Sequence, residues 1–410
     1  MNFRTFVRAA LLAASCLSLP ASAQSGSASS GSAQPDAAPF AQCIAAVGAR
    51  ARAEGLTAPA VAQALAGIRY EQQVIDADRR QPEFVDTFAN YLDRRLTPER
   101  IAAGKLLLAQ HRELLDRLQQ QYGVPAQVLV AFWGLETNYG SFFGRIPVLN
   151  SLATLACDER RPSYFGDELI NALRLVNRGE TTPAQMIGSW AGAMGHTQFM
   201  PSTWLRYAVD GDGDGRVDLW NSTADALSSA AHYLQQIGWR RDQRWGDEVL
   251  VPPSFPYELS GRQRPQTPAR WRELGVKGAG GELSGDPARS LALVVPSGHR
   301  GPAFLVGDNF EVILRWNRSE SYALAVGLLA DRLAGAAPLR VAPPADAPRL
   351  SRAQVEAMQQ KLALLGFAAG EVDGVLGPAT RDALRRFQQQ RGLVADGFPD
   401  SPVLQALGVL

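Results

Sequence analysis

A single glutamate stands at the end of an apolar helical segment, and this segment limits how the rest of the chain can pack. The segment begins at Val124 and runs into a Gly-rich turn. Val128, Phe132 and Leu135 recur at the i, i+4 and i+7 spacing of a helix face that lies in a core. Pro125 suits a first helical position. The pattern predicts a buried helix that ends in a carboxylate.

The carboxylate is that of Glu136, in the last turn beside Trp133 and Leu135. The helix macrodipole is negative at this end and disfavours a second negative charge. Partial burial against aromatic side chains disfavours it further, so both effects raise the pKa. A raised pKa suits a general acid that works near neutral pH. The alternative is a surface glutamate that caps an ordinary core helix.

Length and charge exclude several classes of protein. A chain of 410 residues suggests two to three domains. A formal net charge of +1 provides no basic surface for nucleic acid or for a membrane. The four histidines are widely scattered, which argues against a histidine-based zinc site.

The N-terminus is typical of an export signal. Arg4 and Arg8 precede a short apolar run, and Ala23 ends a small-x-small cleavage site. Residues 1–23 are therefore predicted to be a signal peptide, which implies a periplasmic protein. In an alternative reading, the residues around Cys16 form a lipobox that would be acylated. No later run is long enough to cross a membrane.

Cleavage after Ala23 removes Cys16 and leaves Cys43 and Cys157. Two cysteines in an oxidising compartment favour a disulfide. Two buried free thiols are the alternative.

The composition changes along the chain. Residues 24–38 are a Ser/Gly/Ala-rich leader, residues 338–349 a Pro-rich linker, and Trp245 to Val306 carry short β-type runs between helical segments. This organisation predicts a mainly α (α+β) fold with a catalytic region at 39–337 and a small β-insertion.

A compact C-terminal unit is expected at 350–410. Ser351 can cap a helix in which Val355, Met358, Leu362 and Leu365 form one face. A second helix is expected from Pro378, with Leu384 and Phe387 inward. The unit is small but large enough to form a domain.

Residues 210–215 read Asp-Gly-Asp-Gly-Asp-Gly. Asp210, Asp212 and Asp214 occupy positions 1, 3 and 5 of an EF-hand loop, with the carbonyl of Arg216 at 7 and Asp218 at 9. Many flexible oxygen ligands favour Ca²⁺ over Mg²⁺. An Asp/Gly turn without metal is the alternative.

Four ordered segments resemble the B-type lytic murein transglycosylases, which cleave peptidoglycan. They are the Glu-Thr-Asn-Tyr-Gly motif at 136–140, the small-residue segment 189–203, the Asp-rich segment 210–220 and the segment 309–326. The Gly-Glu-Val-Asp-Gly-Val-Leu-Gly-Pro-Ala-Thr run at 370–380 resembles a three-helix peptidoglycan-binding domain. The resemblance implies a lysozyme-like catalytic core with a helical domain and a small β-domain.

By the same resemblance, Glu136 matches the catalytic acid/base, and Asp225 matches a later aspartate that closes the calcium loop. The residues implied to contact substrate are Ser189, Gln198, Tyr233, Asn317 and Tyr322, together with Arg160 and Arg161 near the peptide-bearing side. Many family members have a tyrosine where this chain has His196, so contacts there are expected to differ.

A hydrolytic glycosidase usually places two carboxylates around the scissile bond. One convincing carboxylate fits a lytic transglycosylase. The resemblance implies that such an enzyme cleaves the bond between N-acetylmuramic acid and N-acetylglucosamine and forms 1,6-anhydromuramoyl ends without a catalytic cofactor. A hydrolytic muramidase and a non-catalytic wall-binding scaffold are the alternatives. We expect a monomer whose partners are peptidoglycan strands and proteins of cell-wall synthesis or division.

Overall fold

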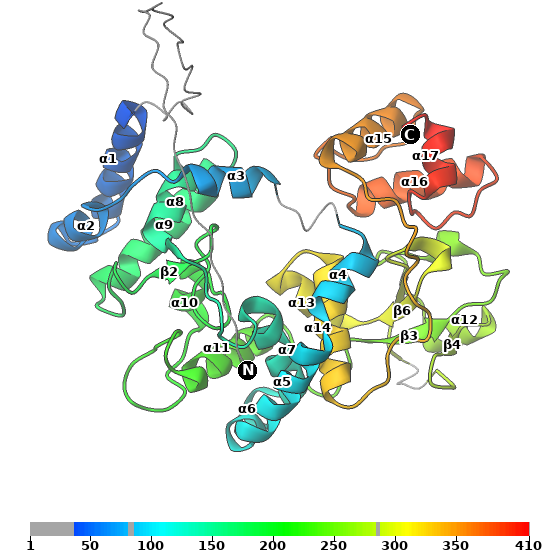
Figure 1. The fold of residues 1–410 in the computed structure, drawn as a ribbon, viewed down its shortest axis with the longest axis horizontal. Coiled ribbons are helices and arrows are strands. Elements are labelled where there is room, and N and C mark those ends of the chain that lie inside the picture. The colour runs from blue at the N-terminus through cyan, green and yellow to red at the C-terminus, as the bar shows by residue number, and fades with distance from the viewer. Residues whose placement is uncertain (1–36, 81–85, 284–287, 410) are drawn as a thin grey trace, which may run out of the picture.

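The computed structural model describes residues 37–80, 86–283 and 288–409. The predicted signal peptide, most of the leader and Cys16 lie outside the described residues. No helix in the described ranges is both long and apolar enough to cross a membrane. The fold is mainly helical, as expected, and its helices form two groups (Figure 1), each with its own hydrophobic core.

One group of helices packs around α9 on the left of Figure 1. Leu152, Leu169 and Leu173 are among its fully buried residues. The group consists of α1 (Ala37–Ala53), α2 (Ala58–Leu65), α3 (Gln72–Arg80), α8 (Val148–Ala156), α9 (Pro162–Asn177) and α10 (Pro201–Tyr207). A two-stranded antiparallel sheet of β1 (Ile146–Pro147) and β2 (Ile187–Gly188) lies at its edge.

A disulfide fixes the N-terminal helix to this group. Cys43 of α1 and Cys157 at the end of α8 are bonded, at a sequence separation of 114. The cystine closes a long loop and anchors α1, which also packs against α2 and α9.

A second group surrounds α7 (Ala126–Thr137), which is buried on almost every side. Pro125 is its N-cap, one residue earlier than predicted. The helices α14, α5, α6 and α11 pack directly on α7. Their bounds, with those of α4 and α13, are α4 (Phe88–Arg95), α5 (Pro98–Gln110), α6 (Arg112–Tyr122), α11 (Thr223–Gln236), α13 (Asp308–Trp316) and α14 (Glu320–Leu333). The helical pattern expected across 101–118 is broken at His111, between α5 and α6.

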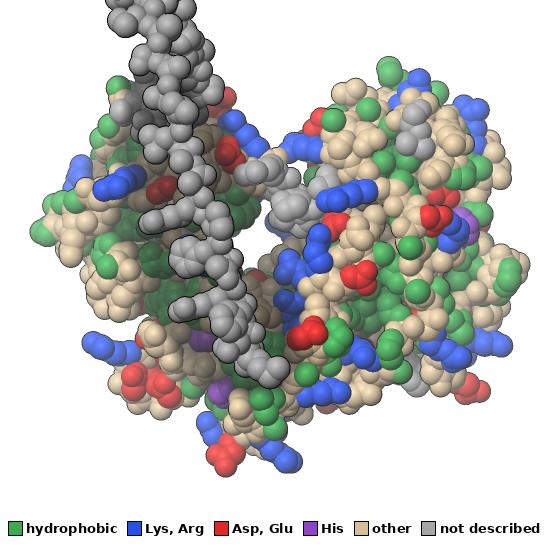
Figure 2. Space-filling model, viewed as in Figure 1, with side chains coloured by type: hydrophobic (Ala, Val, Ile, Leu, Met, Phe, Trp, Pro, Cys, Tyr) green, Lys and Arg blue, Asp and Glu red, His purple; other side chains and the backbone are tan. Residues whose placement is uncertain are grey.

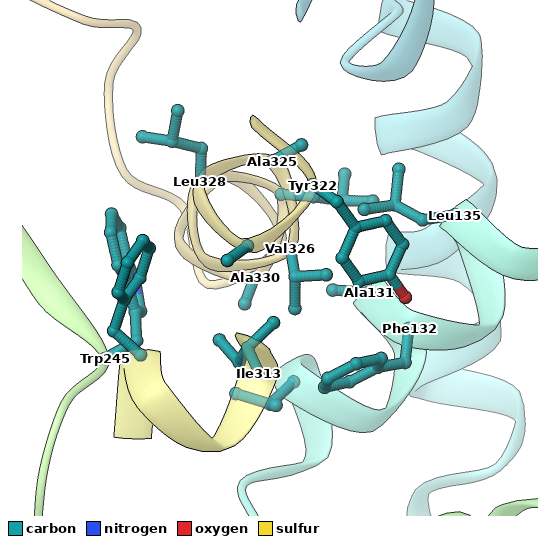
Figure 3. Packing of buried hydrophobic residues seen from close by; sticks show 14 of the residues in the cluster. Ala131, Phe132, Leu135, Trp245, Ile313, Tyr322, Ala325, Val326, Leu328 and Ala330 are labelled. Carbon is teal, nitrogen blue, oxygen red and sulfur yellow. The ribbon is translucent and has the colours of Figure 1, made fainter. Parts of the chain in front are cut away.

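The helix α14 lies between α7 and the β-region. Figure 3 shows Phe132 and Leu135 on one side of α14 and Trp245 on the other. Gly327 is required at this contact, because a Cβ atom there would lie 2.3 Å from the Trp245 ring. Close approach at a glycine therefore couples the β-region to the helix that packs on α7.

The predicted β-insertion forms a four-stranded antiparallel sheet in the order β4-β3-β6-β5. Its own core includes Trp271, Leu293 and Leu305. The elements are β3 (Gly246–Leu250), η2 (Tyr257–Leu259), α12 (Pro268–Glu273), β4 (Lys277–Gly278), β5 (Ala292–Val294), η3 (Gly298–Arg300) and β6 (Ala303–Val306).

The C-terminal unit contains three helices, α15 (Arg352–Leu364), α16 (Pro378–Gln390) and α17 (Ser401–Leu407). Ser351 caps α15 in a full capping box, and Val355, Met358 and Leu362 are buried. The expectation for Leu365 is wrong. Its side chain is 41% exposed, because α15 ends at Leu364 and Leu365 leaves the helical face as its C-cap.

The C-terminal unit docks against the β-region. The backbone N–H of His299 donates to Asp396 Oδ2 at 2.9 Å, and His299 Nδ1 lies 2.7 Å from the same oxygen. Arg264 forms an ion pair with Asp382 of α16. The segment before the unit is also held, since the backbone N–H of Arg340 donates to Glu248. These contacts restrict the motion expected of a simple flexible tether.

Replacing Cys43 and Cys157 together by serine should lower the free energy of unfolding. A loop of this length gives a loss of about 4–5 kcal/mol in the chain-entropy model, because the unfolded chain regains the freedom that the cross-link removes. Denaturant unfolding of the oxidised protein and of the double variant measures the difference. Equal midpoints and slopes would mean that the bridge adds no stability.

Candidate active site

The catalytic candidate Glu136 lies where the two helical groups meet. It is on α7, whose C-cap Asn138 has a left-handed backbone conformation. Trp316, at the end of α13, packs against both hydrophobic cores. The side chain of Glu136 is partly buried at this seam.

Two donors from the C-terminal part of the catalytic region hold the carboxylate. The indole Nε1 of Trp316 donates to Glu136 Oε1 at 2.9 Å. The hydroxyl of Tyr322 donates to the same oxygen. Figure 3 shows the Tyr322 ring turned from α14 toward α7, above Phe132. One carboxylate oxygen therefore has two fixed donors, and the other remains available.

Burial raises the pKa of Glu136 above its usual value. The hydrogen bonds from Tyr322 and Trp316 oppose this, as does the charge of Arg95, but burial is the largest effect. No other carboxylate is among the groups that shift this pKa. The same environment raises the pKa of Tyr322 well above its usual value, mainly through burial and then through Glu136. Tyr322 therefore acts as a donor and not as a base.

Aromatic rings form the wall beside this carboxylate. The Trp316 ring lies 4.5 Å from Phe132, 5.7 Å from Phe199 and 5.2 Å from Tyr233, measured between centroids. The predicted substrate residue Tyr233 is thereby linked to Glu136 through one side chain. Trp316 was not singled out from the sequence, although it stands in a segment that carries the family resemblance.

The turn after α7 is joined to the small-residue segment 189–200. Thr137 Oγ1 donates to the carbonyl of His196, and Trp133 Nε1 donates to His196 Nδ1 at 2.9 Å. Gly144 has a φ of +99°, and a Cβ atom there would lie 1.9 Å from the carbonyl oxygen of Gly188. His196 is therefore buried between two loops, at the position where many family members have a tyrosine.

Gln198 adopts a backbone conformation that non-glycine residues rarely take. Its φ is +50°, and Asn138 and Tyr139 also have positive φ angles. Such conformations cost about 1–3 kcal/mol each and cluster at functional sites. The Gln198 Nε2 donates to the carbonyls of Gly195 and Phe143, at 3.0 and 3.3 Å. Within the described residues its amide oxygen accepts no hydrogen bond, so it is free to accept one from a ligand.

Two further predicted substrate contacts, Ser189 and Asn317, lie near the surface. Ser189 is partly exposed and its hydroxyl accepts from the backbone of Ala193 at 3.0 Å. Asn317 is exposed directly after Trp316, and its side-chain oxygen accepts from the backbone of Ser319. Both lie in segments that touch the Glu136 site.

Arg160 and Arg161 point to a different neighbour. Arg160 Nη1 lies 2.5 Å from a carboxylate oxygen of Asp78 on α3, and Arg161 also forms an ion pair with Asp78. Among the described contacts neither arginine touches Glu136. The Tyr164 ring on α9 is 48% exposed, an aromatic surface that the sequence did not single out. The pKa of its hydroxyl is raised mainly by burial and then by Glu168.

The Asp-rich loop brings three of its predicted ligands together. Carboxylate oxygens of Asp210, Asp212 and Asp214 lie within 4.8 Å of one another, and all three residues are exposed. None of the three forms an ion pair within the described residues. Three acceptor groups without a cation partner at this spacing match the oxygen donors that calcium requires.

Two of the remaining predicted metal ligands, Asp225 and Asp218, accept hydrogen bonds from the backbone of the loop. Asp225 is buried, and its two oxygens accept from the backbone N–H groups of Gly211 and Asp218, at 2.8 and 2.7 Å. Asp218 accepts from Trp220 and Asn221. The carboxylates of Asp225 and Asp218 therefore shape the loop, and Arg216 lies within it.

The chain matches two known families of protein domains. The transglycosylase SLT domain family matches residues 39–331. The chain belongs to this family of lytic transglycosylases. A family of peptidoglycan binding domains matches residues 351–407, which cover the three-helix C-terminal unit. The resemblance found in the sequence is confirmed for both parts.

Solved structures of family members are similar over most of the chain. SltB3 from Pseudomonas aeruginosa, in complex with NAG-anhNAM-pentapeptide, is 44% identical with a TM-score of 0.86, over 90% of this chain and 99% of that one. The Escherichia coli lytic transglycosylase Slt35 in complex with calcium is 28% identical with a TM-score of 0.61, over 72% and 92% of the two chains. The expected lysozyme-like fold is thereby confirmed.

A curated relative agrees with these structures. Membrane-bound lytic murein transglycosylase B of Escherichia coli K12 is 34% identical over 255 residues, which are 60% of this chain. The aligned part spans 66% of that relative, just under two thirds of its length.

Replacing Tyr322 by phenylalanine should shift the pH dependence of activity. The hydroxyl lowers the pKa of Glu136, so its removal raises that pKa further. The protonated acid then persists to higher pH, and the alkaline limb of the rate profile moves upward while kcat falls, since one donor to the reacting carboxylate is lost. Rates across a pH series measure both effects. Tyr257→Phe, in the β-region, is the matched control, and an unmoved alkaline limb in Tyr322→Phe would contradict this assignment.

Proposed function

We propose that this protein is a lytic transglycosylase that cleaves the β-1,4 bond between N-acetylmuramic acid and N-acetylglucosamine in peptidoglycan. The observation that carries the proposal is the carboxylate of Glu136, partly buried and held by two donors, in a chain that belongs to the lytic transglycosylase family. Its raised pKa suits a general acid.

In the first step, protonated Glu136 donates its proton to the glycosidic oxygen as the bond to the muramoyl C1 breaks. Trp316 and Tyr322 stabilise the carboxylate that remains, because hydrogen bonds to an ionised acceptor are the strong ones. Positive charge develops on the muramoyl ring beside the aromatic wall of Trp316 and Tyr233.

In the second step, the Glu136 carboxylate accepts the proton of the muramoyl C6 hydroxyl, whose oxygen attacks C1. The proton passes to Glu136, the C6 oxygen forms the bridge to C1 of the 1,6-anhydro sugar, and no water is consumed. An internal nucleophile has a high effective concentration, which favours it over water. Ser189, Gln198, Asn317 and Tyr164 are the polar and aromatic groups that would orient the saccharide.

Calcium would be held by Asp210, Asp212 and Asp214, with the carbonyl of Arg216 as a further ligand. The Slt35 relative was solved in complex with calcium, and the clustered carboxylates support the same ion for this chain. Because the loop connects α10 to α11, which contributes Tyr233, its role would be to stabilise this side of the site.

The C-terminal unit would hold the enzyme on the polymer. Binding of a second module raises the local concentration of the catalytic site at an insoluble substrate. The export signal predicted at residues 1–23 supports a periplasmic location, with acylation at Cys16 as the alternative. The match to a peptidoglycan binding domain supports a protein that acts on the wall. A monomer, with wall-synthesis or division proteins as candidate partners, is the expectation from the sequence.

The nature of the released sugar end tests the proposed reaction. Mass spectrometry of fragments from purified sacculi should find 1,6-anhydromuramoyl ends with the wild-type protein. Replacing Glu136 by glutamine should lower the rate by about 10²–10⁴-fold or more, because one group serves both steps. Glu113→Gln, an exposed change on α6, is the control. Reducing ends heavier by one water would show a hydrolase, and full activity of Glu136→Gln would reject the mechanism.

Added calcium should raise the thermal midpoint of the metal-stripped protein. A ligand that binds only the folded state, present at a hundredfold excess over its Kd, stabilises by about 2.7 kcal/mol. Asp212→Asn should abolish the shift, whereas Asp242→Asn, an exposed aspartate outside the loop, should keep it. A midpoint that does not respond to calcium in the wild-type protein would leave the loop as a turn without metal.

A further inference from the structure

A cavity of about 380 Å³ lies between the C-terminal unit and the catalytic region. Its walls come from the start of α4, the end of β5, the loop between α13 and α14, and the first half of α16. We propose that this cavity binds a carboxylate of a short acidic peptide, the kind of peptide that peptidoglycan carries on its muramoyl residues. The proposal rests on the function proposed above.

The guanidinium of Arg385 is the first argument. Its side chain belongs to α16, and the residue is 7% exposed. Within the described residues it makes one hydrogen bond, from Nε to Ser260 Oγ at 3.3 Å, and no ion pair. Burial, with the neighbouring charges of Arg381 and Arg264, lowers the pKa of Arg385 to about 10, although Asp382 and Glu320 oppose the shift. A buried cation that lacks a counter-ion costs free energy unless an anion joins it.

Two further arginines line the same cavity without partners. Arg381 lies one helical turn before Arg385 on α16, so the two like charges face the same side and repel each other. Arg318 approaches from the loop after α13. Neither forms an ion pair among the described contacts. Figure 2 shows Lys and Arg side chains along the right-hand edge of the hollow at the centre of the view.

The nearby acids are paired with other cations. Glu320 lies 3.7 Å from Arg262, and Asp382 forms an ion pair with Arg264. Asp86, which also lines the cavity, forms an ion pair with Arg94. Three arginines without an ion pair among the described contacts therefore keep a positive potential in the cavity. The N-terminal end of α16, at Gly377 and Pro378, also lines it and adds the positive end of a helix dipole. An anion is the ligand that these charges favour, and a planar carboxylate fits the geometry of arginine.

The remaining walls favour a peptide over a bare inorganic anion. Leu376, Phe398 and Val295 form apolar surface beside the arginines. Apolar walls with a few placed charges are typical of pockets for organic ligands. A carboxylate attached to a peptide with small side chains would use both kinds of surface.

The first turn of α14 lies between the cavity and the catalytic residue. Ser319 and Ser321 line the cavity, and Tyr322 in the next position donates to Glu136. A polymer strand at Glu136 would therefore bring its neighbouring peptides close to the cavity. Occupation would also bridge the two units, since Arg318 and Arg381 come from opposite sides.

Peptide binding is best measured on the Glu136→Gln protein, which binds without turnover. The probe is a fluorescent pentapeptide that has free carboxylates on its second residue and at its C-terminus, titrated at low salt and monitored by anisotropy. We expect saturable binding that weakens as salt rises. The double variant Arg318→Gln/Arg381→Gln should bind the peptide at least about tenfold more weakly, because charge-assisted hydrogen bonds are lost.

Controls make the result specific. Arg386→Gln removes the same charge from the next position of α16, outside the cavity, and should bind as tightly as its parent. The fully amidated peptide and inorganic phosphate should not compete. Unchanged affinity in the double variant with an unchanged thermal midpoint, or equal competition by phosphate, would overturn the proposal.

The proposed function is tested separately. Wild-type protein should form anhydro ends on peptide-free glycan, where the cavity has no ligand. If no anhydro ends form but the peptide still binds, the proposed reaction is rejected and the peptide site is kept. If anhydro ends form but the peptide does not bind, the peptide site is rejected and the proposed reaction is kept.

Discussion

The hydrogen bonds from Trp316 and Tyr322 to Glu136 are the interaction on which the site depends. They join α7 to α13 and α14 across the boundary between the two helical cores. Without them the carboxylate would be desolvated and unsatisfied at a negative helix end, a combination that costs free energy. With them the acid keeps a fixed position, and its pKa stays raised because burial outweighs the two hydrogen bonds that lower it. The same oxygen atom, Glu136 Oε1, accepts both of these hydrogen bonds.

Much of this was accessible from the sequence, for identifiable reasons. The apolar spacing around Phe132 and the lone Glu136 predicted a buried helix that ends in an acid, and the β-type runs predicted the small sheet. Local signals also predicted the Ser351 cap. The error at Leu365 arose because periodicity does not say where a helix ends, and α15 stops one residue earlier.

Other features could not be read from local patterns. Trp316 and Tyr322 reach Glu136 from 180 and 186 residues away, and no spacing rule links such positions. The docking of the C-terminal unit through His299, Asp396 and Asp382 is equally non-local. The Pro-rich linker suggested a loose tether, but tertiary contacts of Arg340 and Arg264 hold the unit against the β-region.

The long separation between Glu136 and its donors has a consequence for the time course of synthesis. When Glu136 has left the ribosome, the residues that prepare its carboxylate have not yet been made. A truncated product that ends before residue 316 would likewise retain the Glu-Thr-Asn-Tyr-Gly motif without a prepared acid. The order of residues along the chain therefore delays the appearance of a wall-cutting activity until almost the whole catalytic region has emerged.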